Sequence, residues 1–215
     1  MNIKTFVFNP FQENTYLVWD DATREALAID PGMGSEAEWE RFRSFVDANG
    51  LDLRRVLLTH CHIDHLMGTG YVSEACHAEI CGPVGDEAGL PSAVMQSRLF
   101  GVPLGKKPAP VAVDIREGMQ LTLGGSRIRV FDIAGHSHHG LCYYFEDDGV
   151  VFTGDVLFAG SVGRSDFGSA MGGNHETLIE GIVTKLLTLP ADVKVCPGHG
   201  LATTIGHETE HNPYF

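Results

Sequence analysis

The stretch from Leu58 to Gly68, L-T-H-C-H-I-D-H-L-M-G, concentrates metal-type side chains in a way that few folds need. Imidazole and carboxylate groups are common protein ligands of first-row divalent metals. The apolar run from Val56 to Leu58 predicts a buried strand, so the cluster falls where a strand ends and a loop begins, a usual position for functional groups. Its members are His60, His62, Asp64 and His65.

The spacing within this cluster predicts two metals side by side. Side chains alternate along extended backbone, so His60 and His62 can point the same way. Asp64 and His65 then turn toward a second point as the chain enters a helix. A polar surface turn is the alternative, and the density of imidazoles disfavours it.

Three further residues with metal-type side chains follow short apolar runs elsewhere in the chain: His136, Asp155 and His199. Each has glycine beside it, which lets backbone approach a crowded centre closely. If Asp155 bridges, each metal receives three private ligands and one shared ligand, and a position remains for water. We therefore assign Asp64 and Asp155 as catalytic. The predicted metal ligands are His60, His62, Asp64, His65, His136, Asp155 and His199.

Composition restricts the classes of protein. The 215 residues suffice for one single-core domain, expected to span 1–215. A formal charge of −13 argues against nucleic acid as a partner, and no apolar run is long enough to predict a membrane span. The start, M-N-I-K-T-F, predicts a first strand and no signal peptide. Five cysteines without C-x-x-C spacing indicate reduced thiols and a cytoplasmic protein.

The order H-x-H-x-D-H, G-H-S, T-G-D and P-G-H resembles the metallo-β-lactamase fold superfamily. Within it, the chain resembles the glyoxalase II (hydroxyacylglutathione hydrolase) branch, especially its short bacterial members, from about Phe8 to Pro213. The branch-level similarity lies in G-D-V-L-F at 154–158, G-R-S-D at 163–166 and T-I-G-H-E at 204–208. The resemblance implies an α/β fold, a four-layer αββα sandwich in which two packed sheets are covered by helices outside.

The patterns of apolar residues, turn residues and caps predict the individual elements. Ser35 is the expected N-cap of a helix over 35–49, with Glu38 completing a capping box; a second helix is expected over 174–188. The segment 90–110 carries four prolines and is expected to be a loop, either packed on the body, forming a dimer contact or closing over the substrate. Strands are expected at 3–9, 14–19, 25–30, 54–58, 111–115, 119–123, 126–133, 140–146, 149–153 and 193–196.

Two divalent ions would support hydrolysis, because a bound water can have its pKa lowered to about 7. A thioester suits such a site, since a thiol with a pKa of about 8.5 leaves readily as thiolate. The resemblance implies hydrolysis of an S-acylglutathione such as S-lactoylglutathione to an acid and a thiol. Zinc is the expected metal, with iron or manganese as alternatives.

The sequence departs from longer glyoxalase II relatives in three places. With Phe215 as the last residue given, we expect the helical extension that contributes glutathione contacts in those relatives to be missing. Arg164 stands where those relatives place a substrate-contacting lysine, so it is the predicted substrate-binding residue; an ion pair with Asp166 or Glu176 is the alternative. His138 and His139 replace a common proline and glycine, and could bring an extra imidazole to the mouth of the site.

Alternative functions come from the same superfamily. A persulfide dioxygenase would use one iron, held by residues matching His60, His136 and Asp155. A lactonase and a metal-binding protein without catalysis are further alternatives. The expected partner is a small-molecule thioester, with no nucleic acid or membrane, and the chain is expected to be a monomer or homodimer.

Overall fold

The first part of the chain builds a six-stranded mixed sheet. The computed structural model describes residues 1–215. The strand order is β1-β2-β3-β4-β5-β6, antiparallel from β1 to β3 and parallel from β3 onward. The strands are β1 (Asn2–Phe8), β2 (Glu13–Trp19), β3 (Glu25–Ile29), β4 (Asp52–Leu57), β5 (Glu79–Gly82) and β6 (Val113–Asp114).

The second part builds another six-stranded sheet, in the order β14-β13-β10-β9-β8-β7. Only β10 and β13 pair in parallel. A separate hairpin joins β11 (Leu157–Phe158) to β12 (Ser161–Val162). The strands of the sheet are β7 (Gln120–Leu123), β8 (Ser126–Asp132), β9 (Leu141–Phe145), β10 (Val150–Gly154), β13 (Lys194–Pro197) and β14 (Thr203–Thr204).

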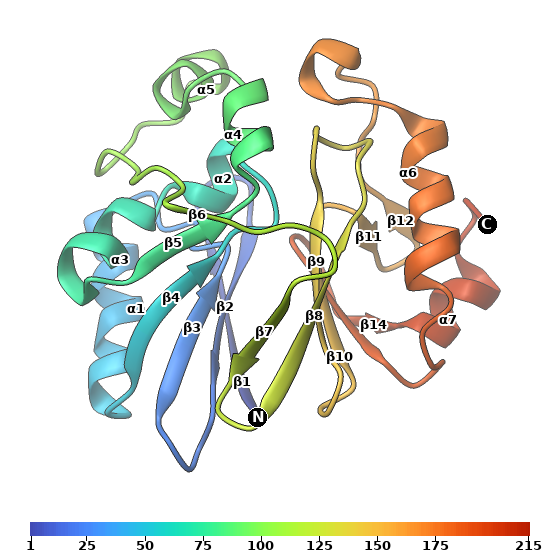
Figure 1. Cartoon of the computed structure of the whole chain (residues 1–215). Helices are drawn as coiled ribbons and strands as arrows, with labels where there is room; N and C mark the ends of the chain where they lie inside the picture. The colour runs from blue at the N-terminus through green and yellow to red at the C-terminus, as the bar shows by residue number, and fades with distance from the viewer.

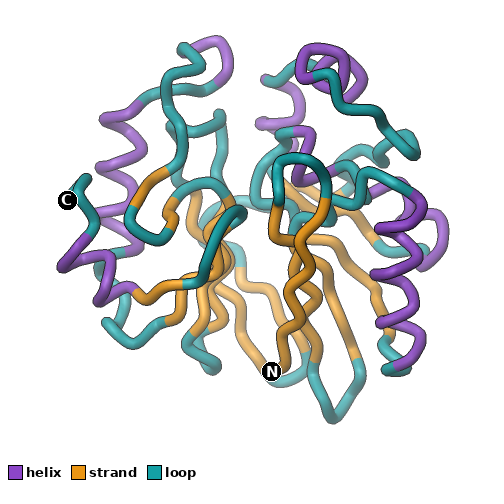
Figure 2. Tube along the Cα trace, turned by 180° about the vertical axis from the view of Figure 1, so that it is seen from behind, coloured by secondary structure: helices purple, strands orange, loops and turns teal.

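The two sheets face each other, and the helices cover the outer side of each sheet (Figure 1). From behind, the strands fill the centre and the helices flank them (Figure 2). No helix combines the length and the apolar character needed to cross a membrane. The helices are α1 (Glu36–Ala48), α2 (Ile63–Leu66), α3 (Thr69–Cys76), α4 (Val84–Gly89), α5 (Ala93–Phe100), the short 3-10 turn η1 (Ser169–Met171), α6 (His175–Gly181), the π-helical η2 (Ile182–Leu186) and α7 (Ile205–His211).

Three clusters of buried apolar side chains stabilise this arrangement, one between the sheets and one under the helices on each outer side. Neighbouring residues of one strand belong to different clusters. In β2, Leu17 packs with the α1 side while Val18 packs between the sheets. In β10, Phe152 packs between the sheets while Val151 packs with α6. Because side chains alternate along a strand, strands covered on both faces are apolar throughout. The expected αββα sandwich is confirmed.

The predicted helix over 35–49 is confirmed as α1, but its cap is only half of a capping box. The Ser35 hydroxyl accepts the Glu38 N–H at 3.3 Å. The Glu38 carboxylate does not return to Ser35; it accepts the N–H groups of Asn9 and Gly34, each at 2.8 Å. It thus joins the β1–β2 turn to the helix start. The helix expected over 174–188 forms as α6 and η2.

The prediction of a loop over 90–110 was wrong for its first half. Ser92 caps α5 by accepting the Met95 N–H at 3.4 Å, and Gly101 ends it with φ 65°. The prolines flank this helix and do not interrupt it, because a proline is tolerated outside a helix interior. The strand expected over 111–115 is reduced to the two residues of β6.

Candidate metal centre

The seven predicted ligands converge at one edge of the two sheets. Those from the first part follow β4 and lie on the loop before α2 and within α2. Those from the second part follow β8, β10 and β13, which run in the same direction. The structure groups the ligand atoms into three overlapping sets, within each of which all atoms lie within 4.8 Å of one another. These sets are His60, His62 and His136; His60, His65 and Asp155; and Asp64, His65 and His199.

The first cluster consists of three imidazoles. His62 Nδ1 lies 3.0 Å from His60 Nε2 and 2.9 Å from His136 Nε2. Burial lowers the pKa of His62 to about 3 and, with the charge of neighbouring His65, places the pKa of His60 well below its usual value. Neutral rings with converging nitrogen atoms are the form that binds a cation.

The second cluster combines imidazoles with a carboxylate. Asp64 Oδ2 lies 3.2 Å from His199 Nε2 and 3.7 Å from His65 Nε2. Burial opposes the charged form of His65, yet the carboxylates of Asp155, Asp64 and Asp30 raise its pKa well above the usual value. In the absence of a metal, a proton therefore supplies the positive charge that these carboxylates attract.

Asp155 lies between the two clusters. Its Oδ2 is 3.5 Å from His136 Nε2, and its Oδ1 is 3.3 Å from His65 Nε2 and 3.5 Å from His199 Nε2. His65 Nε2 and Asp155 Oδ1 are buried and have no hydrogen-bond partner. A buried polar atom without a hydrogen-bond partner lowers the stability of the fold. A cation bound to this nitrogen and this oxygen would supply the missing partner. A carboxylate facing both clusters is the arrangement that a bridging ligand requires.

Four of the five histidine rings are held through Nδ1, which leaves Nε2 directed at the centre. Such outer contacts fix the tautomer and orientation of a metal-binding ring. His62 differs, because it presents Nδ1 itself. The partners are Thr59 Oγ1 for His60 (3.0 Å), Asp30 Oδ2 for His65 (3.0 Å), the Arg164 carbonyl for His136 (2.7 Å) and the Phe11 carbonyl for His199 (3.1 Å).

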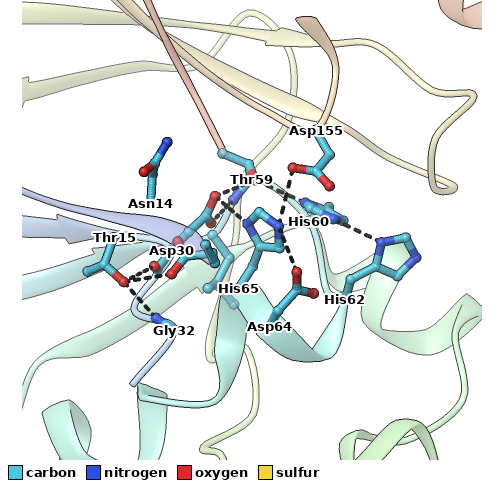
Figure 3. A network of polar contacts seen from close by, with 12 residues as sticks. Asn14, Thr15, Asp30, Gly32, Thr59, His60, His62, Asp64, His65 and Asp155 are labelled. Carbon is cyan, nitrogen blue, oxygen red and sulfur yellow. Dashed lines mark hydrogen bonds and ion pairs between the residues drawn. The ribbon is translucent and has the colours of Figure 1, made fainter. Parts of the chain in front are cut away.

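Asp30 is an important residue that the sequence analysis missed, because D-P-G indicates only a turn. It follows β3 with φ 47° and is 2% exposed. Its carboxylate accepts the Thr59 N–H at 2.7 Å, the Thr59 hydroxyl at 2.6 Å and His65 Nδ1 at 3.0 Å. Figure 3 shows it beside Thr59 and His65, across the His65 ring from Asp64 and Asp155. One carboxylate thus orients both clusters.

Asp86 and Gln96, from α4 and α5, hold the backbone between the first ligands; we call this pair the loop clamp. Asp86 accepts the Cys61 N–H at 2.7 Å and the His139 N–H at 3.1 Å. Gln96 accepts the Ile63 N–H at 3.0 Å and donates to the Cys61 carbonyl at 3.1 Å. The Cys61 side chain is buried and its pKa is raised by burial, consistent with a spacer that faces the core.

The two unusual histidines lie outside the site, so neither brings an extra imidazole to its mouth. His139 Nδ1 pairs with Asp132 Oδ2 at 2.6 Å. The His138 ring packs against Gly89 in α4. Neither lines the pocket over the clusters.

Arg164 lines this pocket, but its guanidinium is paired. Nε and Nη2 donate to the Asp166 carboxylate at 3.0 and 3.1 Å, and Cζ lies 4.7 Å from the centre of the Phe167 ring. The ion pair with Asp166, one of the alternatives offered by the sequence, is therefore present. Contact with a substrate stays a prediction.

An αββα sandwich with two adjoining His/Asp clusters at one edge defines a metal-dependent enzyme of the metallo-β-lactamase type, and comparison with known proteins agrees. The sequence profile of the metallo-beta-lactamase superfamily matches residues 8–199. Over the whole chain, the protein is 37% identical to the hydroxyacylglutathione hydrolase GloC of Haemophilus influenzae, and the match covers 98% of that protein. The chain belongs to the metallo-β-lactamase superfamily, and the resemblance to its glyoxalase II branch is confirmed.

Solved structures extend this result. The crystal structure of the BLEG-1 B3 metallo-β-lactamase has a TM-score of 0.88 and 32% identity, with 99% of both chains covered. TTHA1623 in a di-iron-bound form has a TM-score of 0.82 and 33% identity, with 100% of both chains covered. ETHE1 from Myxococcus xanthus has a TM-score of 0.80 and 28% identity, covering 99% of this chain and 84% of that one. Together with the relatives, they support a metallo-hydrolase with a site compatible with two metals.

Single substitutions should separate the two clusters. We expect His62→Ala and His199→Ala each to reduce the metal content from two ions to one, because each removes a ligand from a different cluster. Asp155→Ala should weaken both sites and abolish turnover. Plasma mass spectrometry after dialysis measures the content, with exposed His207→Ala as control. Two retained ions and near-normal activity in Asp155→Ala would disprove the bridging assignment.

The raised pKa of His65 predicts that metal binding releases protons. At neutral pH the ring is protonated without metal, and binding through Nε2 requires it to be neutral. Affinity should therefore increase as pH rises from 6 to 8. Calorimetric titration with zinc, in two buffers of different ionisation enthalpy, measures the protons released. Equal heats in both buffers would contradict the prediction.

Proposed function

We propose that the protein is a dinuclear metal-dependent thioesterase that hydrolyses S-acylglutathione-type thioesters, such as S-lactoylglutathione, to an acid and a thiol. The observation that supports this most directly is the pocket over the clusters, with a volume of about 310 Å³. Its lining includes side chains of both clusters, and Arg164 is its only other ionisable group. A substrate in this pocket would therefore lie directly against the proposed metal ligands.

The lining also favours a good leaving group. An amide or alkoxide leaving group needs a proton donor placed beside it. Arginine stays protonated in proteins and is a poor acid, and the remaining ionisable groups belong to the clusters. A thiolate leaves without such help, because its conjugate thiol has a pKa of about 8.5. Thioesters thus suit this pocket better than amides do.

In the reaction, the protein itself would hold the metal ions, orient the metal-binding rings and shield them from water. Burial keeps the His60 and His62 rings neutral, and hydrogen bonds to Nδ1 fix the rings of His60, His65, His136 and His199 before substrate arrives. When bound, the two ions would supply a water of lowered pKa and stabilise negative charge on the carbonyl oxygen. Zinc and iron both suit these donors. His60, His62 and His136 would hold one ion, Asp64, His65 and His199 the other, and Asp155 both.

An iron-dependent dioxygenase is the second candidate. A single iron in such enzymes is held by two histidines and one carboxylate, with open positions for oxygen. His136 Nε2 lies 3.5 Å from Asp155 Oδ2, and His60 completes such a set. The structural likeness to ETHE1 keeps this candidate open. The second cluster, which one iron would leave unused, favours the hydrolase.

The two candidates differ in what they consume. We expect the purified protein to hydrolyse S-lactoylglutathione, followed by the loss of thioester absorbance, and to consume no oxygen with glutathione persulfide, followed with an oxygen electrode. Asp155→Ala serves as the inactive control for both assays. Oxygen uptake with one iron per chain and no thioesterase activity would reverse the assignment.

Arg164 is expected to bind a carboxylate of the thiol portion. Arg164→Ala should raise KM about tenfold and leave kcat nearly unchanged, because a contact made equally in ground and transition states affects only KM. Asp166→Asn is the matched variant: it frees the guanidinium and should keep or lower KM. If both variants lower the melting temperature alike and leave KM unchanged, the pair is purely structural.

A further inference from the structure

Aromatic rings surround the candidate metal centre on two different sides. On the side of His199, the Phe158 ring lies 6.2 Å from the imidazole, centre to centre. On the side of the first cluster, the Phe167 ring lies 5.7 Å from the rings of both His62 and His136. Each ring belongs to the lining of the same pocket. A substrate at the centre therefore has a wall on each side.

The wall near His199 is apolar. Phe11 and Phe100 meet edge to face at 5.9 Å, which joins the β1–β2 turn to the end of α5. The backbone of Phe11 is held at both ends, since its N–H donates to Asn9 Oδ1 at 3.0 Å and its carbonyl accepts from His199 Nδ1 at 3.1 Å. The backbone N–H and carbonyl of Phe11 thus already have hydrogen-bond partners within the protein.

The wall near the first cluster is different in character. Arg164 stacks on Phe167 at 4.7 Å and is 71% exposed. This side can receive a charged, solvated group. The centre consequently has an apolar side and a polar side.

A thioester carbonyl carries two substituents, an acyl chain and a sulfur, which extend in different directions. We propose that Phe11, Phe100 and Phe158 form an acyl subsite, and that the preferred substrates carry an unsubstituted apolar acyl group, not a hydroxyacyl group. The thiol portion then extends toward Arg164 and Phe167. This inference rests on the proposed thioesterase function and specifies its substrate class.

The physical reason is the transfer of apolar surface out of water. Each methylene buried against the three rings should raise kcat/KM about fourfold, the equivalent of about 0.8 kcal/mol. A hydroxyl placed against the three rings would lose its bonds to water without gaining a hydrogen-bond partner from the rings, which costs free energy. Lactoyl and propanoyl differ only by that hydroxyl and so form a matched pair.

The experiment measures kcat/KM for glutathione thioesters of acetyl, propanoyl, lactoyl, butanoyl and hexanoyl groups with the metal-loaded protein. We expect a rise along the unsubstituted series and a preference for propanoyl over lactoyl. Phe100→Ala should flatten the rise, and because Phe100 is 52% exposed the fold should persist. Leu99→Ala is the matched control, on the same helix but 66% exposed and outside the lining.

A binding measurement separates this inference from the proposed function. Calorimetry of the metal-loaded protein with hexanoate and with lactate should show tighter binding of hexanoate, and Phe100→Ala should remove the difference. If no thioester is hydrolysed but this difference is found, the thioesterase function fails and the apolar subsite stands. If lactoyl is preferred to propanoyl, or if hexanoate binds no better than lactate, the acyl subsite is overturned.

Discussion

The buried carboxylate of Asp30 is the interaction on which the rest of the site depends. A charge taken out of water is tolerated only when hydrogen bonds compensate it, and here Thr59 and His65 supply three. The same bonds set the start of the ligand loop and the ring plane of His65. Asp30 directly follows β3. Its side chain therefore fixes Thr59 and His65, and through them both clusters, relative to the first sheet.

The two sheets must also keep a fixed relation, since the ligands come from both. Buried polar groups cross the interface between them close to the site. Asn14 of β2 donates to the carbonyls of Pro197 and Gly200 at 3.0 and 2.9 Å. Tyr143 of β9 donates to the Leu58 carbonyl at 2.7 Å. An apolar layer alone would allow sliding, whereas directional bonds hold the strand ends in register.

The converging residues and most strands could be predicted from sequence because their signals are local, whereas the four-layer fold class followed from the family resemblance that the ligand motifs carry. Four metal-type residues between His60 and His65 are a dense pattern that a protein without a metal site rarely needs, and strand alternation is visible over a few residues. Asp30, Asp86 and Gln96 could not be predicted in this way. Each is a single polar residue whose partners include backbone atoms more than twenty positions away. The helix over Ala93–Phe100 was hidden by prolines that lie beside it.

The loop clamp has a consequence for how the centre opens. Asp86 and Gln96 bind the backbone on both sides of His62, so α4 and α5 cannot leave the body while that loop keeps its shape. Detachment of this segment and loss of the first-cluster geometry are one event, a local unfolding step of the kind seen in native-state hydrogen exchange. A bound ion stabilises only the closed form. Metal saturation should therefore protect amides of a segment that holds none of the proposed ligands, and the same opening offers the ion a route of exit.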